Sequence, residues 1–189
     1  MIPQERTIVN VNIQEVAKVP SNILQALQKS ANSAISGDGS CSLPNRQISC
    51  FAAETCAAQQ RALQFSDITH AGRTYIAYIA GMKPEFVGCV TFSEFVPDHV
   101  ETDANKRNVM MTNLCVAKNY RGNHIGKRLI ARAPAPCTLY LEIATHPDLR
   151  ERADRLRSMY AALGFEDVAS SESKLVPRRC MKKSVETKS

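Results

Sequence analysis

Residues 109–130 have the sequence VMMTNLCVAKNYRGNHIGKRLI. Apolar residues with polar breaks over 109–116 predict a strand, and the polar residues from Asn119 to His124 predict a turn. The run from Ile125 to Ile130 predicts the first turns of a helix. A strand, a turn and a helix start together suit an anion, because the first N–H groups of a helix have no intrahelical acceptor. The stretch therefore predicts a phosphate-binding loop.

The side chains around this turn favour the same interpretation but exclude two common nucleotide loops. Arg121, Lys127 and Arg128 add positive charge, and Gly122 and Gly126 let a ligand come close to the backbone. A P-loop needs four residues between its first Gly and its Gly-Lys pair, followed by Ser or Thr. Here three residues separate the two glycines, and Arg128 stands where the hydroxyl is needed. The G-x-G-x-x-G fingerprint of dinucleotide-binding proteins is also absent.

Length and composition predict one globular domain spanning residues 1–189. The chain has 44% hydrophobic and 22% charged residues, which is ordinary for a soluble domain with a sizeable core. No stretch approaches the roughly 18 apolar residues of a membrane-spanning helix. The sequence starts MIPQERTIVNVNIQEV, without the charged and apolar regions of a secretory signal. We therefore expect a cytoplasmic protein with no membrane partner.

The cysteines point to free thiols in a reducing compartment. Their number is odd, and no two of them form a C-x-x-C pair, so the spacing does not suit zinc. No metal is expected. The seven cysteines are Cys41, Cys50, Cys56, Cys89, Cys115, Cys137 and Cys180.

Charge is unevenly distributed along the chain, whose net charge is +6. Residues 1–105 carry 7 basic and 10 acidic residues, a net charge of −3, whereas residues 106–189 carry 17 and 8, a net charge of +9. The basic half contains the predicted phosphate loop. The positive net charge of this half suits a ligand with several phosphates, and it suits nucleic acid equally well.

Periodicity predicts the other elements. The second half contains a β-α-β unit, from strand 109–116 through a short helix to strand 138–144, and this connection requires a parallel pair. In the helix that follows, Leu149, Ala153, Leu156, Tyr160 and Leu163 form one apolar stripe, and Gly164 is expected to end it. The remaining expected elements are a strand at 6–12, a helix at 15–34 broken at Pro20 with Ser21 as an N-cap, a helix at 51–63, a hairpin of strands 74–80 and 86–95, and closing strands at 166–170 and 174–183.

Two motifs in this order resemble the GCN5-related N-acetyltransferase (GNAT) family. Residues 121–126, RGNHIG, lie on the family's acetyl-CoA loop, written R/Q-x-x-G-x-G/A, except that His124 replaces the inner Gly. A negative φ angle at His124 would make this replacement tolerable. The strand LYLEIA, a helix, and then Tyr160 to Phe165 resemble the second cofactor motif, although Ala153 stands where the family often has Asn.

The resemblance implies an α/β (α+β) fold with a GNAT-like central sheet. The sheet is expected to be mixed and mostly antiparallel, with one parallel β-α-β pair and helices on both faces. Motif-level resemblance covers residues 74–184, whereas residues 1–70 agree only in the order of elements.

The resemblance also implies an acetyl-CoA-dependent N-acetyltransferase, in which a primary amine attacks the thioester directly in a ternary complex. Strands 109–116 and 138–144 are expected to splay apart and admit the pantetheine arm, while the loop holds the pyrophosphate. A main-chain N–H near Cys115 is expected to polarise the thioester carbonyl. The cofactor-binding residues implied are Leu114, Cys115, Val116, Arg121, Gly122, Asn123, His124, Ile125, Gly126 and Lys127.

Tyr160 and Glu142 are the catalytic candidates. Tyr160 matches the family's tyrosine and is the expected general acid for the leaving thiolate, although a core tyrosine on an apolar stripe is the competing interpretation. Glu142, or alternatively Glu94, is a candidate base acting on the amine through water, against the competing interpretation of a solvated carboxylate. Cys115 lies mid-strand and is interpreted as a small buried hydrophobe. His124 either contacts phosphate or is merely tolerated at the turn.

Two other functions stay open. The basic half favours a nucleic-acid binder, but the chain lacks Trp and any evident stacking platform. The departures at His124 and Ala153 leave room for a catalytically silent CoA-binding interaction module. The acceptor is expected to be a small-molecule or peptide amine, and the acidic segment 94–103 favours a cationic one unless it is only a solvated connection. A homodimer stays open.

Overall fold

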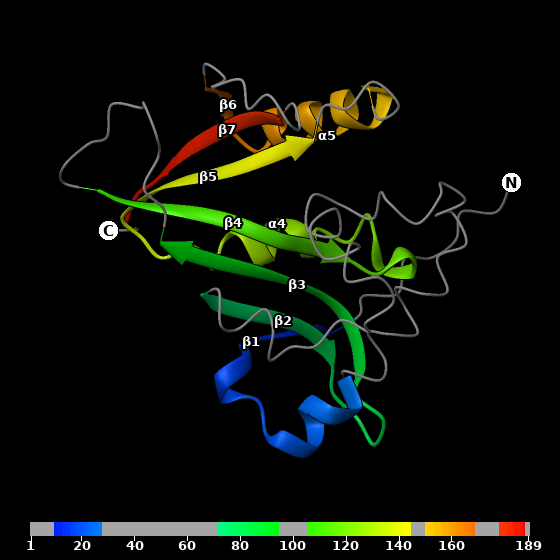
Figure 1. The fold of residues 1–189 in the computed structure, drawn as a ribbon. Helices are drawn as coiled ribbons and strands as arrows, with labels where there is room; N and C mark the ends of the chain where they lie inside the picture. The colour runs from blue at the N-terminus through cyan, green and yellow to red at the C-terminus, as the bar shows by residue number, and fades with distance from the viewer. Residues whose placement is uncertain (1–9, 28–71, 95–105, 145–149, 169–177, 188–189) are drawn as a thin grey trace, which may run out of the picture.

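The computed structural model of the chain describes residues 10–27, 72–94, 106–144, 150–168 and 178–187. A seven-stranded sheet forms the centre of this part, with the order β1-β2-β3-β4-β5-β7-β6 (Figure 1). Neighbouring strands run antiparallel except β4 and β5, which are parallel. The predicted mixed, mostly antiparallel sheet is therefore confirmed.

The strands lie close to the predicted ranges, because alternating and β-branched sequences mark them well. The hairpin is confirmed. The predicted strand at 6–12 overlaps the observed first strand only at Asn12, and its residues 6–9, like the expected helix at 51–63, lie outside the described residues. The strands are β1 (Asn12–Glu15), β2 (Arg73–Ile79), β3 (Glu85–Glu94), β4 (Arg107–Val116), β5 (Cys137–Ala144), β6 (Glu166–Asp167) and β7 (Arg178–Val185).

The helices also follow the sequence pattern, with one difference at a helix start. Residues 21–27 are helical, so the predicted break at Pro20 is confirmed. The N–H of Leu24 donates to the carbonyl of Pro20 at 2.9 Å, so Pro20 holds the cap position and the prediction that Ser21 caps the helix was wrong. The other helices are η1 (Val16–Lys18), η3 (Lys118–Tyr120), α4 (Ile125–Ile130) and α5 (Arg150–Ala162).

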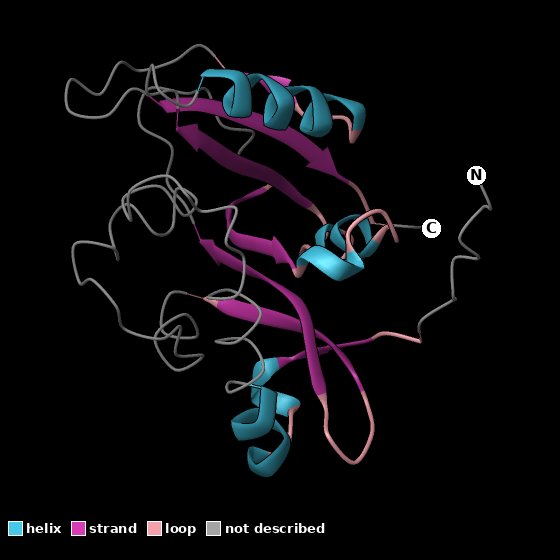
Figure 2. Ribbon diagram, turned by 90° about the vertical axis from the view of Figure 1, so that its right-hand side faces the viewer, coloured by secondary structure: helices cyan, strands magenta, loops and turns pink. Residues whose placement is uncertain are grey.

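Helices cover both faces of the sheet, as expected. The helix at 21–27 and η1 pack on one face, where Leu27 is fully buried against Ile76 and Phe86. Helices α4 and α5 pack on the other face, where Leu129 and Leu139 are fully buried in the main core. Figure 2 shows α5 lying along the strands at one end of the sheet and the helix at 21–27 at the opposite end.

Strand β4 is irregular near its C-terminal end. In its pairing with β3, Cys89 faces Cys115 but Thr91 faces Thr112, so β4 has one extra residue between these positions. Asn113 lies within this bulge and has a φ of 56°. A left-handed residue of this kind bends the strand, and Asn tolerates the conformation better than most residues.

Before the bulge is reached, the pairing of β4 with β5 ends. The parallel pairing joins Arg107–Met110 to Cys137–Tyr140 and does not continue toward Val116. In Figure 1 the two strands diverge toward their C-terminal ends. The crossover between them runs through η3, the turn, α4 and a cis peptide bond at Ala135–Pro136. The last residues of β4 therefore have β3 on one side and no described strand on the other.

Helix α5 ends as the sequence predicts. Gly164 has a φ of 85°, its N–H donates to Ala161 at 2.9 Å, and the N–H of Phe165 donates to Tyr160 at 3.1 Å. No helix in the described ranges is both long enough and apolar enough to cross a membrane.

Candidate functional site

The loop after β4 is held in shape by its own side chains. The Nε of Arg121 donates to the carbonyl of Val116 at 3.0 Å, and the Nδ2 of Asn123 donates to the carbonyl of Tyr120 at 3.2 Å. Gly122 has a φ of 84°, and a Cβ there would meet nothing within 4 Å. The turn is therefore closed on the side of β4 and open on the other side.

Helix α4 begins with free capacity for hydrogen bonds. Its first intrahelical bond runs from the N–H of Arg128 to the carbonyl of His124 at 3.0 Å, and His124 makes no side-chain cap. The N–H groups of Ile125, Gly126 and Lys127 precede this bond and have no acceptor within the helix. A Cβ at Gly126 would meet only Val116, at 3.9 Å. The start of α4 is therefore polar, sterically open and partly positive.

His124 takes a conformation that the sequence did not predict. Its φ is 56° and its ψ is 13°, which is left-handed, so the negative φ that would make the replacement tolerable is not present. The turn needs this angle to lead from Gly122 into the helix. Histidine is one of the residue types enriched in the left-handed region, which explains why it stands at a glycine position at moderate cost.

The charges near the loop differ from the expectation at one residue. Arg121, His124 and Lys127 are exposed beside the turn. Arg128 instead donates through its Nη2 to the carbonyl of Val11 at 2.8 Å, so it ties α4 to the segment before β1. At the base of the loop, burial and a hydrogen bond to Glu85 raise the pKa of Tyr120 to about 12, so this phenol stays protonated at neutral pH.

Leu114, Cys115 and Val116 lie where the sequence analysis placed the pantetheine arm. All three are half-buried, and they follow the point at which β4 leaves β5. Gly88 on β3 lets the strands approach here, because a Cβ on it would lie 2.4 Å from the carbonyl oxygen of Cys115. Among the described strands, only β3 therefore pairs with these residues.

Cys115 has a partner that the sequence did not reveal. Its Sγ lies 3.5 Å from the Sγ of Cys89, directly across the β3–β4 pairing, and the Cys89 thiol also lies 3.4 Å from the carbonyl oxygen of Asn113. The hydrogen bond from Cys89 lowers the pKa of Cys115, whereas the same bond and burial raise the pKa of Cys89. Cys115 is therefore a half-buried residue packed against the core around Cys89, and its thiol has a partner there.

Glu142 and Tyr160 lie on different sides of the sheet. Glu142 is half-buried on β5, opposite Cys180 in register, and its charge together with burial raises the pKa of the Cys180 thiol, burial being the larger cause. Tyr160 is half-buried on α5, packs against the main core, and its ring lies 5.6 Å from that of Phe165. A substrate in contact with both side chains would therefore have to lie between the diverging parts of β4 and β5.

The alternative carboxylates are less favourably placed or not described. Glu94 is exposed and pairs with Val109, at the end of β4 that stays close to β5. Asp98, Glu101 and Asp103 lie outside the described residues. Glu142 is therefore the described candidate that lies beyond the last β5 residue paired with β4, on the side where the two strands diverge.

A buried polar network also escaped the sequence analysis. Thr74 and Thr91 are almost fully buried, and their hydroxyl oxygens lie 2.9 Å apart. The Nδ2 of Asn113 donates to the Thr91 hydroxyl at 3.0 Å. The available signal was the presence of Thr74 and Thr91 in two predicted strands. The side chain of Asn113 reaches Thr91 because of the bulge, which the sequence did not reveal. The network fixes the bend in β4.

A cavity of about 390 Å³ lies at the opposite end of β5 from the loop. It contains none of the residues assigned to the cofactor or to catalysis. In the described part of the chain, no three His, Cys, Asp or Glu side chains gather as a metal site would require. The cavity is lined by Lys106, Thr138, Tyr140, Gly164, Glu166, Lys182, Lys183 and Ser184.

Comparison with known proteins identifies the arrangement of strand, loop and helix. The sequence model of the acetyltransferase (GNAT) domain family matches residues 70–167, which include β4, the loop, α4, β5 and α5. The chain belongs to the GNAT acetyltransferase family. No curated protein sequence matches this GNAT chain.

Solved structures agree with the GNAT fold. A GNAT-family acetyltransferase from Staphylococcus aureus Mu50 is 15% identical, with a TM-score of 0.54 over 93% of this chain and 99% of that one. Arabidopsis thaliana NAA60 in complex with acetyl-CoA is 16% identical, with a TM-score of 0.51 and coverages of 93% and 99%. An aminoglycoside 6'-N-acetyltransferase complexed with coenzyme A is 14% identical, with a TM-score of 0.50 and coverages of 94% and 99%. At these identities the likeness shows the fold.

Proposed function

We propose that this GNAT protein is an N-acetyltransferase that moves the acetyl group of acetyl-CoA to a primary amine by direct attack in a ternary complex. The observation that carries the proposal is the open turn at residues 121–126, which follows the part of β4 that has diverged from β5. Membership of the family supplies the chemistry. We place the whole chain, residues 1–189, in one acetyltransferase domain that acts in the cytoplasm.

The cofactor fits the groups available at the loop. The N–H groups at the start of α4 lack intrahelical acceptors, and Gly122 and Gly126 leave room for a ligand at the backbone. The pyrophosphate of acetyl-CoA would lie against residues 122–127, with Arg121 and Lys127 supplying charge. The pantetheine arm would run beside Leu114, Cys115 and Val116, whose side away from β3 has no described strand.

Catalysis needs a proton acceptor for the amine and a proton donor for the thiolate. A lysine-type amine has a pKa of about 10, so it must lose a proton before it attacks. Glu142 would take this proton through water, because it lies half-buried on β5 just past the last residue paired with β4. Tyr160 would donate a proton to the leaving thiolate from the other side of the opening. An N–H near Cys115 would stabilise the oxyanion.

Calorimetric titration with acetyl-CoA tests the cofactor site. We expect micromolar binding that is lost in Arg121→Glu and in Gly126→Asp, because both place negative charge beside the pyrophosphate. Gly126→Ala is the matched control, since the Cβ fits the available space. Arg150→Glu, on the exposed face of α5, controls for the change in net charge. Absence of binding by the unaltered protein at millimolar acetyl-CoA would sink the proposal.

Turnover distinguishes an enzyme from a catalytically silent CoA-binding module. The left-handed His124 in the loop is the observation that keeps the silent module in view. We expect a screen of small-molecule and peptide amines to give an acceptor, and Tyr160→Phe and Glu142→Gln to lower kcat by about 10²-fold or more without abolishing acetyl-CoA binding. Tight binding of acetyl-CoA with no acetylation of any acceptor class would favour the silent module.

A further inference from the structure

The thiols of Cys89 and Cys115 are placed to form a covalent bond. The two residues are direct partners across an antiparallel pair, and their Sγ atoms are 3.5 Å apart. Directly opposite residues have Cβ atoms about 4.5–5.5 Å apart. A disulfide needs Cβ atoms about 3.5–4.5 Å apart and Cα atoms about 4.4–6.8 Å apart. Small side-chain rotations and a slight approach of the strands therefore suffice to join them.

The pairing is specific to these two cysteines among those that the structure describes. All four described cysteines are free. Cys137 faces Arg107 and Val185 in register, and Cys180 faces Glu142, so neither is opposite another described cysteine. Only Cys89 and Cys115 share both a register position and a sulfur–sulfur contact.

The two thiols differ in a way that suits stepwise oxidation. Cys115 is half-buried near the C-terminal end of β4, in the part of the strand that is no longer paired with β5. Cys89 is 1% exposed and lies in the core. The hydrogen bond from Cys89 and, more weakly, the charge of Arg121 lower the pKa of Cys115. A thiolate is the reactive form of cysteine, so Cys115 would react first and Cys89 would resolve the product.

We infer that Cys89 and Cys115 form a reversible oxidation site, at which hydrogen peroxide converts the pair into a disulfide between β3 and β4. In the first step the Cys115 sulfur attacks the peroxide, an S–O bond forms, the O–O bond breaks, and the released hydroxide takes a proton to become water. In the second step the Cys89 sulfur attacks the Cys115 sulfur, an S–S bond forms, the S–O bond breaks, and the Cys89 proton leaves with the hydroxide as water. Both thiols are oxidised, and one peroxide is reduced to two waters.

The oxidation would regulate the proposed cofactor site, and this part rests on the proposed function. Cys89 is enclosed in the core, so closing the sulfur–sulfur distance to about 2.0 Å draws β4 toward β3. Leu114, Cys115 and Val116 lie on the segment that moves. The oxidised protein is therefore expected to bind acetyl-CoA several-fold more weakly than the reduced protein, and bound acetyl-CoA is expected to slow the oxidation.

Peptide mass spectrometry of the full chain tests the oxidation site. The protein is treated with stoichiometric hydrogen peroxide, remaining thiols are alkylated, and the chain is digested. We expect one cross-linked peptide pair joining Cys89 to Cys115. Its mass should be two hydrogens less than the sum of the two reduced peptides, and dithiothreitol should separate it into those peptides. The link is expected to vanish in Cys89→Ser and in Cys115→Ser, and to persist in Cys180→Ser, a half-buried cysteine on β7 that serves as the matched control.

Two results would overturn the inference. One is Cys115 oxidised to a sulfinic or sulfonic acid while Cys89 is recovered alkylated. The other is a Cys115 disulfide to a different cysteine. Calorimetry on the reduced and oxidised protein tests the regulatory part, which equal acetyl-CoA affinities would refute. If the reduced protein fails to bind acetyl-CoA, the proposed function is refuted. The peptide mass spectrometry still shows whether the disulfide between Cys89 and Cys115 forms.

Discussion

Single residues shape the loop through their backbone angles. Gly122 and His124 both have positive φ, and the extended residue Arg121 connects Gly122 to the preceding helix η3. The motif alone located Gly122 and showed that His124 departs from it. The motif did not give the angle at His124, because φ depends on how the turn must meet both β4 and α4.

Gly122→Ala is expected to destabilise the fold by about 1–2 kcal/mol, because a left-handed non-glycine residue costs about that much. The substitution adds no clash, since nothing lies within 4 Å of the new Cβ. Gly81→Ala is the matched control: its surroundings are equally open, and its φ is not in the left-handed region. Urea unfolding of the two variants measures the effect. Equal stabilities would contradict a strained turn.

Thr91→Val is expected to destabilise the fold by about 1–3 kcal/mol, because a buried polar group that loses its partner bears its desolvation cost. The change removes the acceptor of the Asn113 Nδ2 and the neighbour of the Thr74 hydroxyl. Thr112→Val, half-buried opposite Thr91 in register, is the control and should stay within about 0.5 kcal/mol. Guanidinium unfolding compares them, and similar losses at both positions would argue against the network.

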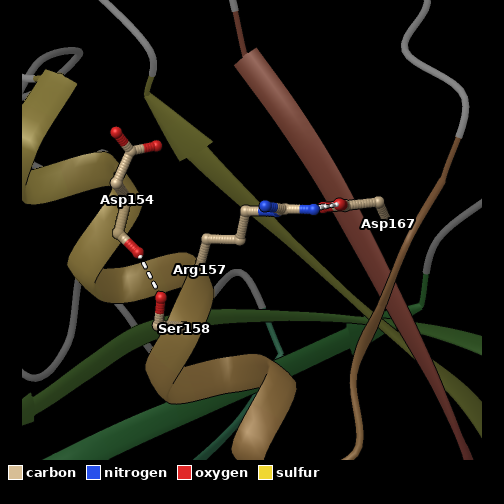
Figure 3. A network of polar contacts seen from close by, with 4 residues as sticks. All are labelled: Asp154, Arg157, Ser158 and Asp167. Atoms are coloured by element: carbon tan, nitrogen blue, oxygen red, sulfur yellow. Dashed lines mark hydrogen bonds and ion pairs between the residues drawn. The ribbon is translucent and has the colours of Figure 1, made fainter.

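At the scale of elements, the end of α5 is joined to β6 by an ion pair. The Nε of Arg157 lies 2.8 Å and the Nη2 lies 2.5 Å from the same carboxylate oxygen of Asp167 (Figure 3). Figure 3 also shows Ser158 donating to the carbonyl of Asp154, at 2.9 Å, on the preceding turn. The pair arises because Gly164 reverses the chain and brings β6 back beside α5.

The Arg157–Asp167 pair is expected to make part of the stability depend on acid pH. Its hydrogen bond to Arg157 lowers the pKa of Asp167, so the pair stabilises the fold above the unfolded pKa of about 3.9 and loses this effect as pH falls through the lower folded value. Arg157→Gln should therefore be less stable than the unaltered protein at pH 7 and approach it below about pH 4. Urea titrations over this range measure the difference.

Arg155→Gln is the control for the same helix, since Arg155 is exposed and has no ion pair among the described residues. A stability difference for Arg157→Gln that stayed constant from neutral to acid pH would contradict the assignment. The effect at neutral pH is expected to be small because both side chains are exposed to solvent.

The positions of the strands were predicted more completely than the register in which neighbouring strands pair. The strand at 109–116 is evident from its apolar residues, but the bulge at Asn113 is not, because one inserted residue leaves the composition unchanged. The contact between Cys89 and Cys115 depends on that insertion. Both cysteines were visible in neighbouring predicted strands, yet their register was set only when β3 and β4 packed.

At the scale of the whole molecule, acetyl-CoA should stabilise the fold. A ligand present at 100 times its Kd adds about 2.7 kcal/mol, and for a domain of this size each kcal/mol raises Tm by roughly 2–4 °C. We therefore expect a rise of roughly 5–10 °C in a thermal scan. The rise should disappear in Gly126→Asp and persist in Gly126→Ala. A rise of equal size in Gly126→Asp would place acetyl-CoA elsewhere on the protein.

The sequence by itself determined the fold class and the family and predicted a phosphate loop, because these depend on local periodicity, turn residues and motif spacing. It located Arg121 to Gly126 and Tyr160 by order along the chain. Only the tertiary structure decided that Arg128 turns away to Val11, that Glu142 and Tyr160 lie on opposite faces, and that Cys115 meets Cys89. These facts depend on strand register and on contacts between residues distant in sequence, which no local pattern encodes.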